Sequence, residues 1–232
     1  MRRNDEMSWY RHPGQRLKAH WRFKLIAGTS ITVMFFICYF LLQDFPVFRV
    51  REVPNTALDR LIDFQPFTLW LYLSLLLYVS LPAWLLDNKR DLVVCSLVLS
   101  GLCLAGLTFF LLWPTCIPPV EVNRVRHPGF VPLLWVDKPH NVCPSLHVAF
   151  AVFAAMFTHR LASQLGNTRL VRWVSWCWCA GILYSTLATK QHVAIDLYAG
   201  SALGAAWAWG YLRFFPPRGS VLLRFAKVMA TG

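Results

Sequence analysis

The sequence predicts an all-α integral membrane protein, a bundle of six transmembrane helices, on three observations. Of its 232 residues, 56% are hydrophobic and only 15% are charged, whereas soluble domains carry about 25% charged residues. The apolar residues are gathered into long runs. The basic residues are shared unequally among the segments that separate these runs.

The first three apolar runs contain no charged residue; they are residues 25–42, 67–86 and 92–113. At a rise of about 1.5 Å per residue, roughly 20 helical residues cross the hydrocarbon core of a bilayer. A cleaved signal peptide is the alternative for the first run. However, the basic leader is long and no small-residue cleavage site follows Leu42, so we expect a retained helix.

Three further runs carry few polar residues. Residues 142–158 are interrupted only by His147, and residues 193–212 carry only Asp196 as a charge. Residues 173–189 between them are uncharged. Titratable groups inside membrane helices are expensive and usually functional, so both exceptions are candidate site residues.

The basic residues predict the orientation of the bundle. Alternate connections of a six-helix protein lie on opposite faces, and one set holds 16 of the 23 Lys and Arg residues. The positive-inside rule therefore places both termini in the cytoplasm. The chain then divides into a basic cytoplasmic leader (1–24), one membrane domain (25–213) and a cytoplasmic tail (214–232).

This asymmetry also accounts for the net charge of +12. We therefore expect the basic segments to touch lipid headgroups, and we expect no binding of nucleic acid. The compact size and the charge bias favour a bacterial inner membrane, with an internal eukaryotic membrane left open. Nothing in the sequence implies an obligate protein partner.

The predicted orientation brings two polar clusters to one membrane face. The fourth and sixth helices both run inward from the non-cytoplasmic side. Ser145 and His147 therefore lie at the outer end of the fourth helix, and His192 and Asp196 at the outer end of the sixth. We expect an active site at this non-cytoplasmic face.

His192 and Asp196 are four residues apart, which places them about 6 Å apart along one helix face. An aspartate in this position can accept the Nδ1–H of the histidine and fix its tautomer. Nε2 is then free to act as a nucleophile or base.

The same face offers groups that would bind an anion. Ser145 follows a proline and is a natural helix cap, and the free backbone N–H groups of helix N-termini attract phosphate. Lys190 lies next to His192 in sequence, and the adjoining loop adds Arg124, Arg126 and Lys138. Together these residues predict a pocket for a phosphoryl group.

Two motifs carry a resemblance to a known family. `PSLH` (144–147), followed by an apolar helix, resembles the second signature motif of the type 2 phosphatidic-acid phosphatase superfamily. Ser185, His192 and Asp196 resemble the third. In sequence, residues 137–141 and `TKQH` (189–192) are most similar to the inositol-phosphorylceramide synthase-like branch. The resemblance covers residues 113–204.

The resemblance implies a mechanism. His192 would attack phosphorus to give a phosphohistidine, and Asp196 would orient it. His147 would protonate the leaving group and then activate the acceptor, usually water. Ser145 would help to hold the phosphate. The family needs no metal, so the resemblance implies no cofactor.

The sequence departs from the family pattern in two places. Thr186 stands where the third motif usually has an arginine, and we expect Lys190 to take over phosphate binding. The first motif, K-x6-R-P, has no clean match, which leaves Arg126 and Arg124 as candidates for its arginine.

The leading hypothesis is a phosphatase that acts on an amphiphilic lipid phosphate or pyrophosphate. A phosphotransferase that moves a phospho-headgroup onto a lipid hydroxyl is the first alternative. A non-catalytic lipid-binding or transport protein on the same fold is another. A metal site is a further alternative, since catalytic zinc needs three protein ligands; it would draw on His127, His140, His147, His192 and Asp196.

Two smaller features concern packing. Gly200 and Gly204, four residues apart, predict a face on which another helix packs closely. Cys116 and Cys143 fall in or next to one non-cytoplasmic loop, where a disulfide would be permitted. Their separation in sequence does not by itself establish such a bond.

Overall fold

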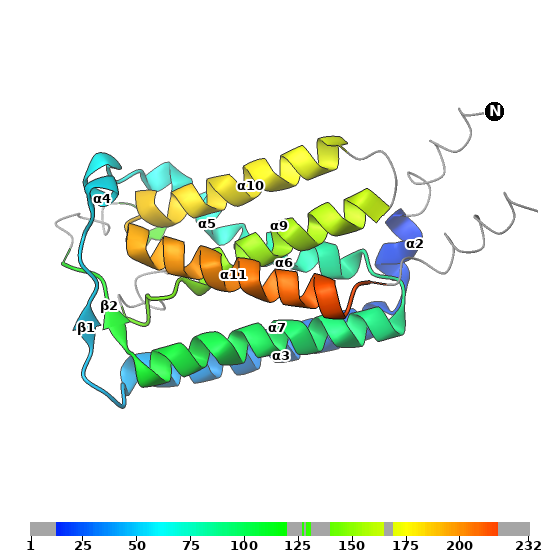
Figure 1. Cartoon of the computed structure of the whole chain (residues 1–232), viewed down its shortest axis with the longest axis horizontal. Helices are drawn as coiled ribbons and strands as arrows, with labels where there is room; N and C mark the ends of the chain where they lie inside the picture. Colours follow the sequence, from blue (N-terminus) through cyan, green and yellow to red (C-terminus); the bar gives the residue numbers. More distant parts are fainter. Residues whose placement is uncertain (1–12, 120–126, 128, 131–139, 165–168, 218–232) are drawn as a thin grey trace, which may run out of the picture.

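The computed structural model describes residues 13–119, 127, 129–130, 140–164 and 169–217. In this part of the chain long helices lie side by side along one axis (Figure 1). The helical elements are α2 (Pro13–Lys18), α3 (Trp21–Asp44), α4 (Ala57–Leu61), η1 (Pro66–Thr68), α5 (Leu69–Leu73), α6 (Leu75–Trp84), α7 (Lys89–Leu112), α9 (Leu146–Gln164), α10 (Arg169–Ala188) and α11 (Ala194–Phe214). A two-residue pair, β1 (Arg51–Glu52) and β2 (Thr115–Cys116), is the exception to the predicted all-α fold in the described residues.

Four helical segments are long and apolar enough to cross a membrane: Trp21–Asp44, Pro66–Trp84, Lys89–Leu112 and Leu146–Gln164. All four coincide with predicted spans, although the second is broken into η1, α5 and α6. The other two predicted spans are also helices, α10 and α11, but they do not reach the same hydropathy. Tryptophan, glycine and polar site residues dilute their apolar content, so six membrane crossings and the side of the termini stay predictions.

Helix α9 is the centre of the bundle and packs against α6, α10 and α11. Its contact with α11 is unusually close. A Cβ atom added at Gly200 would collide with the backbone of Ser145, and one added at Gly204 would collide with the backbone of Ala149. The predicted packing role of the two glycines is therefore confirmed.

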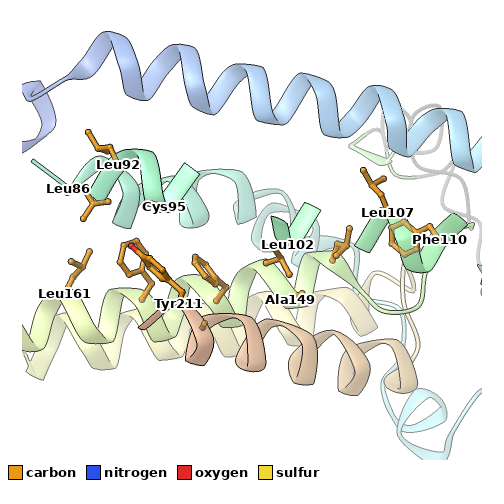
Figure 2. Packing of buried hydrophobic residues seen from close by; sticks show 13 residues of the cluster. Leu86, Leu92, Cys95, Leu102, Leu107, Phe110, Ala149, Leu161 and Tyr211 are labelled. Atoms are coloured by element: carbon orange, nitrogen blue, oxygen red, sulfur yellow. The ribbon is translucent and has the colours of Figure 1, made fainter. Parts of the chain in front are cut away.

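The largest apolar cluster fills the space between α7, α9 and α11 (Figure 2). Its labelled members include Leu102 and Phe110 of α7, Ala149 of α9 and Tyr211 of α11. Helix α3 lies on the outside of α7 and shows a mostly exposed surface. An exposed apolar helix of this length is expected where lipid covers it.

The two long connections meet at one end of the bundle, opposite α2 (Figure 1). Strands β1 and β2 pair in parallel there, so residues 51–52 and 115–116 are joined. The amide of Asn141 donates to the carbonyl oxygen of Thr115 at 2.7 Å. The connections predicted to share a face thus lie together, next to the N-termini of α9 and α11.

The opposite end of the bundle is fixed by two basic residues of the leader. The ammonium group of Lys24 donates to the carbonyl oxygens of Arg16 and Trp84, each at 2.7 Å. Arg16 also approaches Asp87 to 3.6 Å. These contacts hold α2 against the end of α6.

Replacing Gly204 by alanine tests the close packing of α9 and α11. Because the new methyl group meets the Ala149 backbone, we expect a loss of about 1–3 kcal/mol of stability. Gly210 is the matched control on the same helix, since a Cβ there meets nothing within 4 Å. Gly210→Ala should be neutral or stabilising by up to about 1 kcal/mol. Unfolding midpoints in detergent give the comparison, and equal shifts in both variants would contradict the packing argument.

Candidate active site

The N-termini of α9 and α11 are joined directly through their backbones. The amide of Ser145 donates to the carbonyl oxygen of Asp196 at 3.1 Å. Ser145 is fully buried, and its Oγ accepts the amide of Val148 at 3.3 Å, which is the predicted cap of α9. The two polar clusters, 45 residues apart in sequence, therefore lie at the same end of the bundle.

His192 and Asp196 are brought together, but not on one helix face as predicted: α11 begins at Ala194, and His192 lies in the turn before it. Nδ1 of His192 lies 3.5 Å from Oδ2 of Asp196, and the carboxylate is completely buried. The same Oδ2 accepts the amide of Val193 at 3.0 Å. At 3.5 Å the histidine contact is an ion-pair distance and longer than a good hydrogen bond. Nδ1 faces the carboxylate, so Nε2 is the nitrogen left for other chemistry.

His147 is held by Tyr72 of α5, a residue that carried no sequence signal. The two rings stack with centroids 3.9 Å apart and an interplanar angle of 9°. Nε2 of His147 lies 2.9 Å from the carbonyl oxygen of Tyr72. A carbonyl oxygen only accepts, so Nε2 carries the proton and Nδ1 is the nitrogen available for proton transfer.

Both histidines line one cavity of about 420 Å³. Its walls are mainly apolar side chains of α3, α6 and α7, and it extends from the site to Lys24 and Trp84 near the other end of the bundle. Polar residues gather at the histidine end. They are His140, Asn141 and Gln191.

Three buried nitrogens of these polar residues have no hydrogen-bond partner among the described residues: His140 Nδ1, Asn141 Nδ2 and Gln191 Nε2. Buried polar groups are normally paired, and an unpaired one is costly. The position of Gln191 at the cavity was not predicted, although this residue directly precedes His192. His140, named above only as a candidate metal ligand, also lines the cavity.

Lys190 is placed differently from the prediction. Its ammonium group donates to the carbonyl oxygen of Asp59 at 2.8 Å and also to that of Ile62. Both acceptors lie within residues 56–65, which contain α4 and are called the α4 segment below. Lys190 is not among the cavity-lining residues. Its backbone has a φ of 56°, the left-handed turn between α10 and α11.

Thr186, at the position of the family's arginine, lies in the last turn of α10 and is bonded to the turn that follows. Its carbonyl oxygen accepts the amides of Gln191 and His192, each at 3.2 Å. Its hydroxyl donates to the carbonyl oxygen of Leu183. The side chain is fully buried, and the residue shapes the chain before His192. The other predicted phosphate ligands, Arg124, Arg126 and Lys138, lie outside the described residues.

The metal-site hypothesis needs three ligands in one place. Across the described ranges, no three His, Cys, Asp or Glu side chains are arranged to hold a metal ion. His127 packs on Phe64, with ring centroids 5.6 Å apart, and does not line the cavity. The described residues therefore give the metal hypothesis no geometric support.

Cys116 and Cys143 are both free thiols. The amide of Cys143 donates to Oγ1 of Thr115 at 2.9 Å, which ties the residue to β2. Burial raises the pKa of the Cys143 thiol to about 12, and the neighbouring carboxylate of Asp196 adds to the shift. This thiol is therefore a neutral group beside the buried aspartate.

The comparisons with known proteins gave one finding. A family model described as the PAP2 superfamily matches residues 92–220, more than half of the chain. The match spans α7 to α11 and includes His147, His192 and Asp196. No curated protein and no solved structure matches the chain.

Thiol labelling tests whether Cys143 is a free and neutral thiol. With a pKa of about 12, roughly one thiol in 10⁴ is ionised at pH 8, so a small thiolate-selective reagent should label it about 10³-fold more slowly than in unfolded protein. The rate should rise about tenfold per pH unit above this. Mass spectrometry gives the extent of labelling. A Cys116–Cys143 cross-linked peptide from unreduced protein would contradict the free-thiol state.

Proposed function

Because the chain belongs to the PAP2 superfamily, we propose that it is a membrane phosphatase for lipid phosphates or pyrophosphates that works through a phosphohistidine. The family identifies it as a phosphatase- or phosphotransferase-type enzyme acting on phosphate esters. The lipid substrate, the intermediate and the use of water as acceptor are our proposals. So is a site on the non-cytoplasmic face of a bacterial inner membrane.

One observation carries the lipid part of the proposal. His147 and His192 lie at the polar end of an otherwise apolar cavity between α3, α6 and α7. A substrate that fits this arrangement has a phosphate group and a hydrocarbon chain. The hydrocarbon chain of the substrate would lie against the apolar cavity walls. Burial of each of its CH₂ groups away from water is worth about 0.8 kcal/mol.

The first chemical step uses His192 and His147 on opposite sides of the phosphorus. Nε2 of His192 attacks phosphorus as the bond to the ester oxygen breaks. His147 enters this step as the imidazolium, with a proton on both ring nitrogens, and its Nδ1–H passes to that oxygen, which leaves as the lipid alcohol. Asp196 stabilises the positive charge that develops on the His192 ring.

The second step regenerates the enzyme. His147, now neutral at Nδ1, accepts a proton from water as the water oxygen attacks phosphorus. The phosphorus–nitrogen bond breaks, and inorganic phosphate leaves. The positive dipole ends of α9 and α11 lie at this end of the bundle and would stabilise the negative charge on the phosphoryl oxygens in both steps.

The proposal predicts that three residues control turnover. His192→Ala should abolish phosphate release, with a loss of at least about 10³-fold, since the nucleophile is removed. His147→Ala and Asp196→Asn should each lose about 10²- to 10⁴-fold. The assay uses purified protein, chelator and a panel of lipid phosphates and pyrophosphates, and it reads both free phosphate and new lipid products.

The outcomes of this assay separate the alternatives. A labelled lipid product without free phosphate identifies a phosphotransferase, for which the apolar cavity also offers a path to a lipid hydroxyl. Full turnover by His192→Ala would end the phosphohistidine proposal. A protein that binds lipid phosphates but releases no phosphate is a binding or transport protein. Loss of activity with chelator would reopen the metal hypothesis.

The length of the cavity predicts selectivity for the hydrocarbon chain. Gly28 lines the cavity near its end farthest from the histidines, and a Cβ atom added there meets no atom within 4 Å. Gly28→Phe should therefore fill the cavity and raise KM for long-chain substrates about tenfold, the loss of roughly two buried CH₂ groups. Short-chain substrates should be unaffected. Gly210→Phe, also in open space but not at the cavity, is the control, and equal effects on both chain lengths would contradict the assignment.

A further inference from the structure

The α4 segment is bonded directly to the start of α11. Asp59 of α4 is buried, and its Oδ1 accepts the amide of Ala194, the first residue of α11, at 2.8 Å. Its Oδ2 accepts the amide and the hydroxyl of Thr56 at 2.7 and 2.8 Å. Both carboxylate oxygens of Asp59 therefore accept hydrogen bonds, Oδ1 from the start of α11 and Oδ2 from the start of α4.

The turn before α11 makes a second set of hydrogen bonds with the α4 segment. The ammonium group of Lys190 donates to the backbone carbonyl oxygens of Asp59 and Ile62. The amide of Gln65 donates to the carbonyl oxygen of Ala188 at 2.8 Å. Ala188 and Lys190, at the start of the turn, and Ala194, just after it, are thus all hydrogen-bonded to the α4 segment.

These hydrogen bonds fix the positions of His192 and Asp196, the nucleophile and its carboxylate partner in the proposed chemistry. The first amides of a helix have no partner within the helix, and a carboxylate there gains both a charge-assisted hydrogen bond and a favourable dipole interaction. His192 lies two residues before Ala194, and Asp196 two residues after it. Fixing the Ala194 amide therefore fixes the backbone that carries the pair.

We propose that Asp59 is a positioning residue of the reaction, with Lys190 as its counterpart. We name their bonds to each other's segments the Asp59–Lys190 clasp. The clasp rests on the proposed role of His192 as nucleophile. It holds the His192 ring over the Asp196 carboxylate, where the present Nδ1–Oδ2 separation is 3.5 Å. Asp59 lies outside residues 92–220, so the family match does not include it.

Asp59→Asn tests the first half of the clasp. An amide offers one oxygen in place of two, so it cannot accept from both Ala194 and Thr56. Because a misplacement of about 1 Å costs roughly 100-fold in rate, we expect kcat to fall by about 100-fold with KM for a short-chain substrate little changed. Asp63→Asn makes the same chemical change on an exposed residue of the same segment, and its activity should equal that of the wild type.

Thr56→Ala separates positioning from simple stability of α4. It removes one bond within the α4 segment and leaves the bond from Ala194 to Asp59 intact. We expect it to lower kcat by less than about tenfold, far less than Asp59→Asn. Equal kcat losses in the two variants, accompanied by equal falls in unfolding temperature, would overturn the positioning role.

Lys190→Asn tests the second half, because asparagine tolerates the left-handed backbone at this position but is too short to reach the carbonyl oxygens. The clasp predicts a lower kcat and an unchanged inhibition constant for inorganic phosphate. A rise in that inhibition constant with kcat preserved would make Lys190 a phosphate ligand and overturn its part in the clasp.

Hydrogen exchange separates the clasp from the proposed function, since it does not depend on turnover. Amides of residues 189–196 should exchange faster in Asp59→Asn than in Asp63→Asn, and unchanged exchange would overturn the clasp. The proposed function fails independently of this result if the wild type releases no phosphate from any lipid phosphate, or if His192→Ala keeps its rate.

Discussion

The geometry of the site depends on how closely α11 approaches α9. The two helices meet through backbone atoms at Ser145 and Asp196, and this is possible because Gly200 and Gly204 leave no Cβ between them. That contact places both helix N-termini side by side at one end of the bundle. His147 of α9 and His192, in the turn before α11, then line a common cavity, and the positive dipole ends of both helices lie at the same end of the bundle.

Much of this arrangement could be predicted because its causes are local in sequence. Long uncharged runs identify membrane helices, and the four-residue spacing predicted that His192 and Asp196 meet, although His192 lies in the turn before α11 and not on its face. The unequal distribution of basic residues then predicted that Ser145 and His192 share an end of the bundle, and the structure confirms it. The motifs identified the superfamily, and the match over residues 92–220 agrees, while the branch within it stays a prediction.

The features that could not be predicted join segments far apart in sequence. The α5 helix was read only as part of a span, yet Tyr72 stacks on His147 across 75 residues. Lys190 was assigned to phosphate from its place beside His192, but its long side chain reaches the carbonyl oxygens of Asp59 and Ile62. The sequence shows neither a ring's neighbour nor the direction of a flexible side chain. Helices α10 and α11 were predicted as spans, but their tryptophans, glycines and polar residues keep their mean hydropathy below that of the four candidate spans.

The shape of the cavity has a consequence for the kinetic order of the reaction. One apolar cavity leads to both histidines, so a lipid alcohol acceptor that used it would have to wait until the first lipid product had left. Transfer between two lipids would then follow ping-pong kinetics, and each lipid at high concentration would compete with the other. Water approaching from the polar end would face no such competition. In the proposed mechanism, occupancy of the cavity after the first step would thus decide whether the phosphoryl group is passed to water or to a second lipid.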